Sequence, residues 1–169
     1  ELAMSPWSDQ RALLKIGLKG FLPAEAQRPS ANLVFLLDVS GSMNAPDKLP
    51  LLKKSLLMLS RQLTAEDKVS IVVYAGASGV VLEPTQGNQT FEIEKALEKL
   101  SAGGGTNGQA GIQLAYQLAQ QAHIPEGINR VILATDGDFN VGTSDVNALK
   151  KMIEEKRKSG ISLTTLGFG

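Results

Sequence analysis

Hydrophobic residues form an unbroken run at positions 33–37, and polar residues follow this run at once. A short, continuous apolar run predicts a strand that is buried on both faces, as in the middle of a parallel sheet. The polar residues Asp38, Ser40 and Ser42 then lie at the carboxyl end of this strand, where open α/β sheets place their ligands. Gly41 permits the backbone turn that would direct the carboxylate and both hydroxyls to a common point.

The rest of the chain alternates between strand and helix periodicities. Short apolar or alternating runs predict strands at residues 12–19, 32–38, 69–75, 80–82, 130–135 and 162–167. Apolar residues spaced three and four apart predict a helix from Leu49 to Leu63 and further helices at residues 91–100, 109–121 and 146–159. Asp47 is the expected N-cap of the first helix, with Pro50 in its first turn, and Gly160 ends the last helix.

Strands that alternate with helices predict a doubly wound α/β fold, in which helices cover both faces of a mostly parallel sheet. The exception is the short strand at 80–82, which returns from a turn at 76–79 and is therefore antiparallel to its neighbour. Pro84 is expected to end this strand, and a proline there suits the edge of a sheet.

The first 30 residues are expected to form an N-terminal extension with one strand, and residues 31–169 the main domain. Residues 1–10 look irregular, and Trp7 is expected to anchor them against the domain. An α/β domain rarely ends on a strand with nothing packed after it. We therefore expect the sequence to be a fragment of a longer protein.

Composition removes several classes of function. Seventeen Lys plus Arg balance seventeen Asp plus Glu, so charge gives no reason to expect nucleic acid or an acidic membrane surface as a partner. The chain has no cysteine, which excludes disulfides, thiolate metal sites and cysteine nucleophiles. No run of 18 apolar residues occurs, so we expect no direct insertion of this chain into a membrane.

Three polar loops are expected at strand ends or helix starts. They contain Asp38, Ser40 and Ser42, then Thr106 and Asn107, and then Asp136 and Asp138. Each loop alone has a purely structural interpretation, because Asp, Ser and Thr cap helices and Asp-Gly forms turns. Together, two carboxylates and three hydroxyls form a set of hard oxygen ligands that suits Mg²⁺, Mn²⁺ or Ca²⁺ and does not suit zinc or copper.

The ordered motifs Asp-x-Ser-x-Ser, a Thr in a Gly-rich loop and Thr-Asp-Gly resemble the metal-ion-dependent adhesion site of von Willebrand factor type A (VWA) domains. The resemblance covers about residues 31–169. It implies that Ser40 and Ser42 bind the metal directly, and that Thr106 binds it directly or through water. Asp38 and Asp136 would hold coordinated waters and orient the hydroxyls.

The resemblance also implies the order of the strands in the sheet, which would run 80–82, 69–75, 32–38, 130–135 and 162–167. The segment before residue 31 lies outside the family pattern and looks like the extension of some bacterial extracytoplasmic VWA proteins. The resemblance alone suggests a periplasmic or cell-surface location. The family's last strand and last helix are missing, so residues 162–167 would be covered by the strand at 12–19, by a neighbouring chain or by residues absent from the sequence.

The function that follows is metal-dependent binding of a protein, without catalysis. A Mg²⁺ ion, or Mn²⁺ or Ca²⁺, held mainly by neutral hydroxyls keeps an open position that an Asp or Glu carboxylate of the partner can fill. The main alternative is a metal-assisted phosphotransferase or hydrolase, for which Asp138 is the one additional ionisable candidate in these loops. Otherwise, we expect Asn107 and Asp138 to contact the metal ligands without binding the metal themselves. A third interpretation is a structural scaffold whose metal only holds the three loops together.

Two other motifs lack the context that their chemistry needs. Gly103, Gly105 and Gly108 match a dinucleotide fingerprint, but they follow a helical segment and not a strand. A serine hydrolase would need His123, the single histidine, as its base. His123 lies at the far end of the helix that begins near the serines, roughly 15–20 Å away, and is expected to be a solvated helix-end residue.

Overall fold

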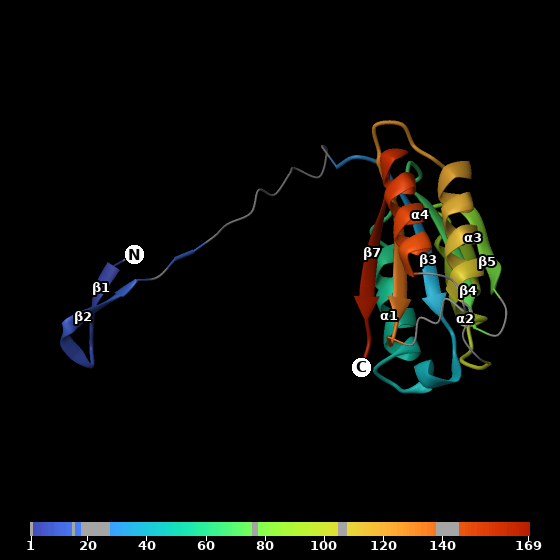
Figure 1. The fold of residues 1–169 in the computed structure, drawn as a ribbon. Helices are drawn as coiled ribbons and strands as arrows, with labels where there is room; N and C mark the ends of the chain where they lie inside the picture. The colour runs from blue at the N-terminus through green and yellow to red at the C-terminus, as the bar shows by residue number, and fades with distance from the viewer. Residues whose placement is uncertain (1, 15, 18–27, 76–77, 105–107, 138–145) are drawn as a thin grey trace.

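The computed structural model describes residues 2–14, 16–17, 28–75, 78–104, 108–137 and 146–169 (Figure 1). They form a two-stranded hairpin and a five-stranded sheet. The hairpin consists of β1 (Leu2–Ser5) and β2 (Ser8–Leu14). The sheet consists of β3 (Ala31–Asp38), β4 (Lys68–Tyr74), β5 (Ser78–Gln86), β6 (Ile128–Thr135) and β7 (Ile161–Gly167).

The larger sheet has the strand order β5-β4-β3-β6-β7, which confirms the order that the resemblance implies. β3 pairs in parallel with both β4 and β6, and β6 pairs in parallel with β7, whereas β5 is antiparallel to β4. The arrowheads of β3, β6 and β7 consequently point to the same end of the molecule in Figure 1. Polar residues that follow these strands are therefore brought together beyond the carboxyl ends of the strands.

Helices cover both faces of this sheet, and this confirms the doubly wound α/β fold. They are η2 (Gly41–Asn44, a 3₁₀ helix), α1 (Leu49–Ser60), α2 (Thr90–Glu98), α3 (Gly108–Gln121) and α4 (Val146–Lys158). Phe35 and Leu37 of β3 pack into a core with α1 and α2, and Val34 and Leu36 pack into a second core with α3. The apolar run of β3 is continuous because successive side chains enter opposite cores.

The helix α3 approaches the sheet closely at Gly111. A Cβ atom at this position would lie 2.9 Å from Cβ of Tyr74 and 3.1 Å from Cδ1 of Leu36. A larger residue would therefore push α3 away from the ends of β3 and β4. The glycine lets the N-terminal turns of α3 lie directly over the strand ends that carry the candidate site.

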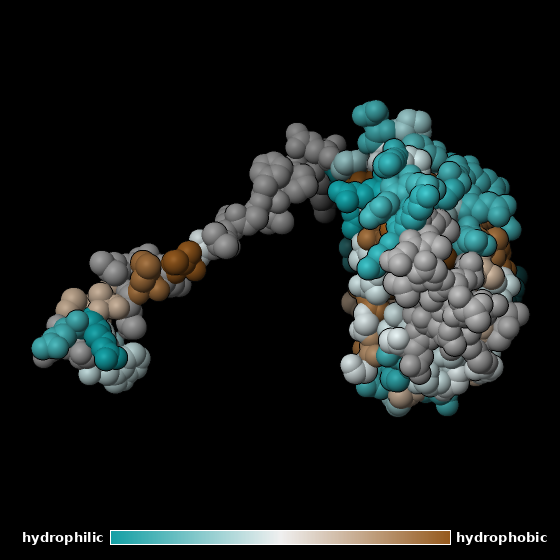
Figure 2. Space-filling view, viewed as in Figure 1, coloured by the Kyte–Doolittle hydropathy of each residue, from teal (hydrophilic) through white to brown (hydrophobic). Residues whose placement is uncertain are grey.

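The N-terminal segment differs from the prediction. Of the expected strand at 12–19, residues 12–14 belong to β2, which pairs with β1 in a hairpin whose turn is at Pro6 and Trp7. Residues 15, 18 and 19 lie outside the described residues. Trp7 is 82% exposed, so the expectation that it anchors the segment against the domain is wrong. Leu14 and Ile16 are also exposed, and Figure 2 shows hydrophobic residues at the surface of this segment. The division between extension and domain at residue 30 stays a prediction.

Several boundaries in the main domain also differ from the prediction. Pro84 lies inside β5 and does not end it, because an edge strand tolerates a residue without an N–H group. Lys48, and not Asp47, is the N-cap of α1, which has Pro50 in its first turn as expected and ends at Ser60.

The strand β7 lies at the opposite edge of the sheet from β5, and within the described residues it pairs with β6 alone. The N-terminal strand β2 does not cover it, because β2 pairs with β1. The other two expected coverings, by a neighbouring chain or by residues absent from the sequence, stay predictions. Among the described residues, no helix has the length and apolar character that a membrane span requires.

Candidate metal site

Asp38 ends β3 and is fully buried, with its carboxylate held by three separate groups. One oxygen, Oδ1, accepts a hydrogen bond of 2.9 Å from the backbone N–H of Ser40. The other, Oδ2, accepts bonds of 3.3 Å from the Tyr74 hydroxyl and 3.2 Å from the Thr135 hydroxyl. Tyr74 and Thr135 end β4 and β6, the two neighbours of β3. The carboxylate is thus fixed by the sheet on both sides and by the turn that follows.

The turn after β3 brings the two serine hydroxyls together. Ser40 Oγ and Ser42 Oγ lie 3.1 Å apart, with Ser40 buried and Ser42 exposed. The N–H of Met43 donates to the carbonyl of Ser40 at 3.0 Å, and the fully buried Met43 side chain fixes η2 on the core. Gly41 does not adopt a left-handed conformation, and a Cβ there would meet no atom within 4 Å. The 3₁₀ turn and the buried Met43 side chain therefore hold the two serine hydroxyls together, and no conformation special to glycine is needed at Gly41.

Asp136 follows β6 and forms an ion pair with Lys48. The Lys48 ammonium lies 2.9 Å from Oδ2 of Asp136, and the Asp136 side chain is only 4% exposed. Lys48 directly precedes α1, so the ion pair joins the end of β6 to the start of that helix. A cation is thus already placed against one of the two carboxylates of the candidate site.

Beyond the effect of burial, the carboxylates of Asp38 and Asp136 both raise the pKa of the Tyr74 hydroxyl. Burial raises the pKa of the Tyr74 hydroxyl well above its ordinary value, the Thr135 hydroxyl opposes this, and the charges of Asp38 and Asp136 raise it further. The tyrosine therefore stays protonated and serves as a hydrogen-bond donor to Asp38 at any physiological pH.

The segment before Thr106 lies against the serine turn. The N–H of Gly103 donates to the carbonyl of Val39 at 2.7 Å, and the N–H of Gly41 donates to the carbonyl of Gly104 at 3.4 Å. Thr106 itself lies outside the described residues, as do Asn107 and Asp138. Among the described site residues, Asp38, Ser40 and Ser42 are thus in mutual contact, and Asp136 follows Thr135, whose hydroxyl donates to Asp38. Metal binding by these residues stays a prediction.

Sequence reasoning missed Tyr74, Thr135 and Lys48. Tyr74 pairs with Asp38 in the register of β3 and β4, and Thr135 is the last residue of β6. Both are polar residues that end buried strands, and that position was the available signal. His123 was predicted correctly, because it is exposed just beyond the far end of α3.

The donor set fits a small hard cation. It offers two neutral hydroxyls at close range and two buried carboxylates, which are oxygen ligands suited to Mg²⁺, Mn²⁺ or Ca²⁺. Within the described part of the chain, no cluster of three or more His, Cys, Asp or Glu residues could hold a metal ion.

Comparisons with known proteins agree with this fold and place the chain in a family. A family model described as the von Willebrand factor type A domain matches residues 33–139. The chain is 46% identical over 169 residues to the protein YfbK of Escherichia coli, covering all of this chain and 29% of YfbK. It is 28% identical over 157 residues to human inter-alpha-trypsin inhibitor heavy chain H4, covering 88% of this chain and 17% of that protein.

A solved structure shares the fold. A von Willebrand factor type A structure from Catenulispora acidiphila superimposes with a TM-score of 0.68 at 22% sequence identity, covering 82% of this chain and 33% of that one. The chain therefore spans well under half the length of each of these three similar proteins.

Proposed function

Because this chain belongs to the von Willebrand factor type A family, we propose that it binds a protein partner through a divalent cation and a carboxylate of that partner. Domains of this family commonly mediate protein–protein interactions. The observation that best supports the metal-dependent mode is the pair of Ser40 and Ser42 hydroxyls 3.1 Å apart, beside a carboxylate that three hydrogen bonds hold in place.

Each residue has a distinct role in this proposal. Ser40 and Ser42 would hold the cation directly, and Thr106 would do so directly or through water. Asp38 and Asp136 would hold and orient coordinated waters. When bound, Mg²⁺, or Mn²⁺ or Ca²⁺, would supply a positive centre with an open position for an Asp or Glu side chain of the partner.

We propose a binding module rather than an enzyme because the described ionisable groups are poorly suited to proton transfer. Asp38 accepts three hydrogen bonds, and the raised pKa of Tyr74 keeps it protonated. The metal-assisted phosphotransferase or hydrolase depends on Asp138. Metal-dependent turnover of a generic phosphate ester that is lost in Asp138→Asn would replace the binding proposal with the enzymatic one.

The proposal is tested first on the metal. Ser42→Ala removes an exposed hydroxyl and should weaken Mg²⁺ binding about tenfold or more in isothermal titration calorimetry while leaving the fold unchanged. Ser55→Ala is the matched control, because the exposed Ser55 hydroxyl bonds only to the Leu51 carbonyl within α1 among the described residues. Equal Mg²⁺ affinity in both variants would remove Ser42 from the site.

The second test concerns the partner. Proteins captured on the immobilised domain should be released by EDTA and recovered on addition of Mg²⁺ or Mn²⁺, and the Ser42→Ala domain should capture them poorly. Exchange of the partner's Asp or Glu for the amide should have the same effect. Capture that is equal with and without EDTA would place recognition elsewhere, and the exposed Trp7 segment would then be the first candidate.

A further inference from the structure

A groove of about 410 Å³ opens directly beside the serine turn. One wall comes from the end of η2 and the first turns of α1, and the other comes from the segment that follows α2. Its lining includes Asn44, Leu49, Pro50 and Lys54 on the first wall, and Leu100 and Ala102 on the second.

The groove is continuous with the candidate metal site. Asn44 ends the 3₁₀ helix that carries Ser42, so the first wall begins at the site itself. The second wall leads directly into Gly103, whose N–H donates to the carbonyl of Val39 in the serine turn at 2.7 Å. A peptide with one side chain at the metal site would therefore have the groove as an adjoining path for its neighbouring residues.

The groove has apolar walls and a positive charge. Its charged lining residues are Lys53 and Lys54. The Lys53 ammonium is engaged by the carbonyls of Leu100 at 3.0 Å and Glu98 at 3.3 Å, where it caps the end of α2. Lys54 is exposed and, among the described residues, makes no hydrogen bond or ion pair. Lys54 is thus the charge in the groove that is available to a ligand.

The two lysines lie where this groove meets a second hollow, because both hollows are lined by them. Farther along α1 and α2, a smaller hollow of about 150 Å³ is lined by the same two lysines and also by Glu94 and Glu98. Those glutamates balance the lysines there, whereas no acidic residue lines the larger groove. The larger groove therefore offers an acidic ligand a lysine and no acidic lining residue, whereas the smaller hollow also presents two glutamates.

We propose that this groove binds an extended, acidic and apolar peptide segment of the same partner whose carboxylate reaches the metal site. This inference rests on the proposed function. A second Asp or Glu of the segment pairs with Lys54, and an apolar side chain lies on Leu49, Pro50 and Leu100. The groove would thus select among carboxylate-bearing partners, because the metal alone accepts any exposed Asp or Glu.

The test uses a phage-displayed library of short peptides with one fixed Asp and randomised flanking positions, selected on the 169-residue chain in Mg²⁺. Peptides selected by the unaltered chain should be enriched in a second acidic residue next to apolar ones. Lys54→Glu should reduce their affinity about three- to tenfold and shift the selection toward basic residues. Lys151→Glu on α4 makes the same change of charge on the other face of the sheet and should have no effect.

The outcomes separate this inference from the proposed function. Peptides that need Mg²⁺ but are indifferent to Lys54→Glu, or that lack a second acidic residue, would overturn the groove inference and leave metal-dependent binding intact. Acidic peptides that bind equally in EDTA but weaken in Lys54→Glu would support the groove and overturn the metal-dependent mode. Selection of no peptide in either condition would overturn both.

Discussion

At the scale of single residues, the candidate site depends on side chains that are buried to different degrees. Asp38 lies in the core and satisfies three donors, whereas Ser42 is at the surface. Removal of the Asp38 carboxylate would take away the oxygen that accepts from both the Tyr74 and the Thr135 hydroxyl, and loss of a buried hydrogen-bond partner destabilises proteins by about 1–3 kcal/mol. Ser42 is therefore the position at which metal binding can be tested without loss of the fold.

Lys48 provides a prediction about the metal itself. Its ammonium stands against Asp136, so a divalent cation bound at the site would experience its repulsion. Lys48→Met keeps most of the aliphatic stem and removes the charge. We expect Mg²⁺ affinity to rise about fivefold, corresponding to about 1 kcal/mol for a partly exposed charge, when measured by calorimetry at low salt.

The same substitution should lower the melting temperature of the metal-free protein, because the buried Asp136 loses a neutralising partner. Lys95→Met, at an exposed position on α2, is the control for loss of a positive charge. Affinity that stays the same or falls in Lys48→Met would show that Lys48 does not compete with the cation.

The sequence pointed to the candidate ligands but not to the groups that hold them in place. Asp38, Ser40 and Ser42 occupy alternate positions of one five-residue motif, so their spacing alone brings them near one another. Tyr74 and Thr135 reach Asp38 only through the register of β3 with β4 and with β6. The polar ends of these two strands mark Tyr74 and Thr135 as candidates, but only the pairing of strands distant in the sequence shows that both face Asp38.

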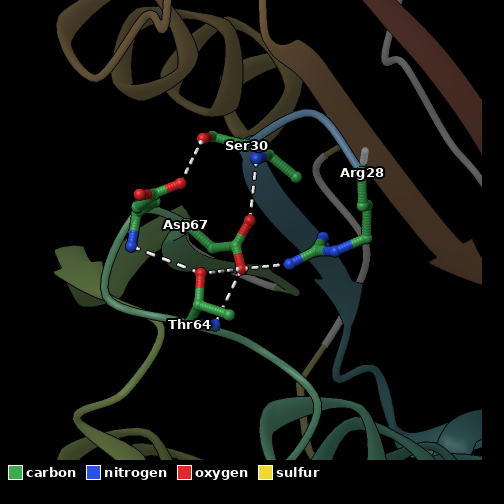
Figure 3. Close-up of polar contacts among 6 residues, drawn as sticks. Arg28, Ser30, Thr64 and Asp67 are labelled. Carbon is green, nitrogen blue, oxygen red and sulfur yellow. Dashed lines mark hydrogen bonds and ion pairs between the residues drawn. The ribbon is translucent and has the colours of Figure 1, made fainter. Parts of the chain in front are cut away.

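At the scale of elements, Asp67 joins the segment before β3 to the connection between α1 and β4 (Figure 3). Its side chain is fully buried and accepts hydrogen bonds from the N–H of Ala31 at 2.8 Å, from the N–H and hydroxyl of Thr64 at 2.8 and 3.0 Å, and from Arg28. Burial alone would raise the pKa of Asp67, but the bonds from Arg28, Thr64 and Ala31 outweigh it and leave the pKa below its ordinary value.

This network predicts a dependence of stability on pH. Because the pKa is lower in the folded state, the stabilisation from Asp67 is complete above the unfolded value of about 3.8 and is lost as the pH falls through the folded value. Asp67→Asn should lower the free energy of unfolding by about 2–4 kcal/mol at pH 7, because the amide group must face donors. Its stability should also fall less steeply than that of the unaltered protein below pH 3.8.

Urea unfolding from acid to neutral pH measures both effects. Glu66→Gln is the neighbouring control, because Glu66 is exposed and its bond from the Ser30 hydroxyl is long, at 3.3 Å. It should change stability by less than about 0.5 kcal/mol. An Asp67→Asn protein as stable as this control at neutral pH would mean that the buried network contributes little.

The central elements could be predicted more reliably than the first ones for a physical reason. Other elements pack against β3, β6 and α3, so the apolar periodicity of these segments reflects real burial. The alternation near Leu14 and Ile16 is equally regular, yet both side chains are exposed. Alternation shows which side chains share a face, but it does not show what that face packs against, and the hairpin turn at Pro6 and Trp7 was therefore missed.

At the scale of the whole molecule, the candidate metal site lies at the carboxyl ends of the strands and the groove adjoins it between α1 and the segment after α2, whereas the hairpin is a separate candidate surface. These two surfaces can be distinguished by fluorescence, because Trp7 is the single tryptophan of the chain and is 82% exposed. We expect its emission to resemble that of tryptophan in water and to change little when the α/β domain unfolds. Circular dichroism on the same sample should report that unfolding as a cooperative transition.

Trp7 fluorescence measured during partner binding then shows which of the two surfaces the partner covers. If the partner docks at the metal site and groove, Trp7 emission and its quenching by iodide should stay nearly constant on binding, and EDTA should reverse the binding measured by calorimetry. If the partner instead covers the hairpin, the Trp7 ring loses water, so its emission should shift to shorter wavelength and iodide should quench it less. A blue shift that persists in EDTA would refute recognition through the cation and assign binding to the N-terminal hairpin.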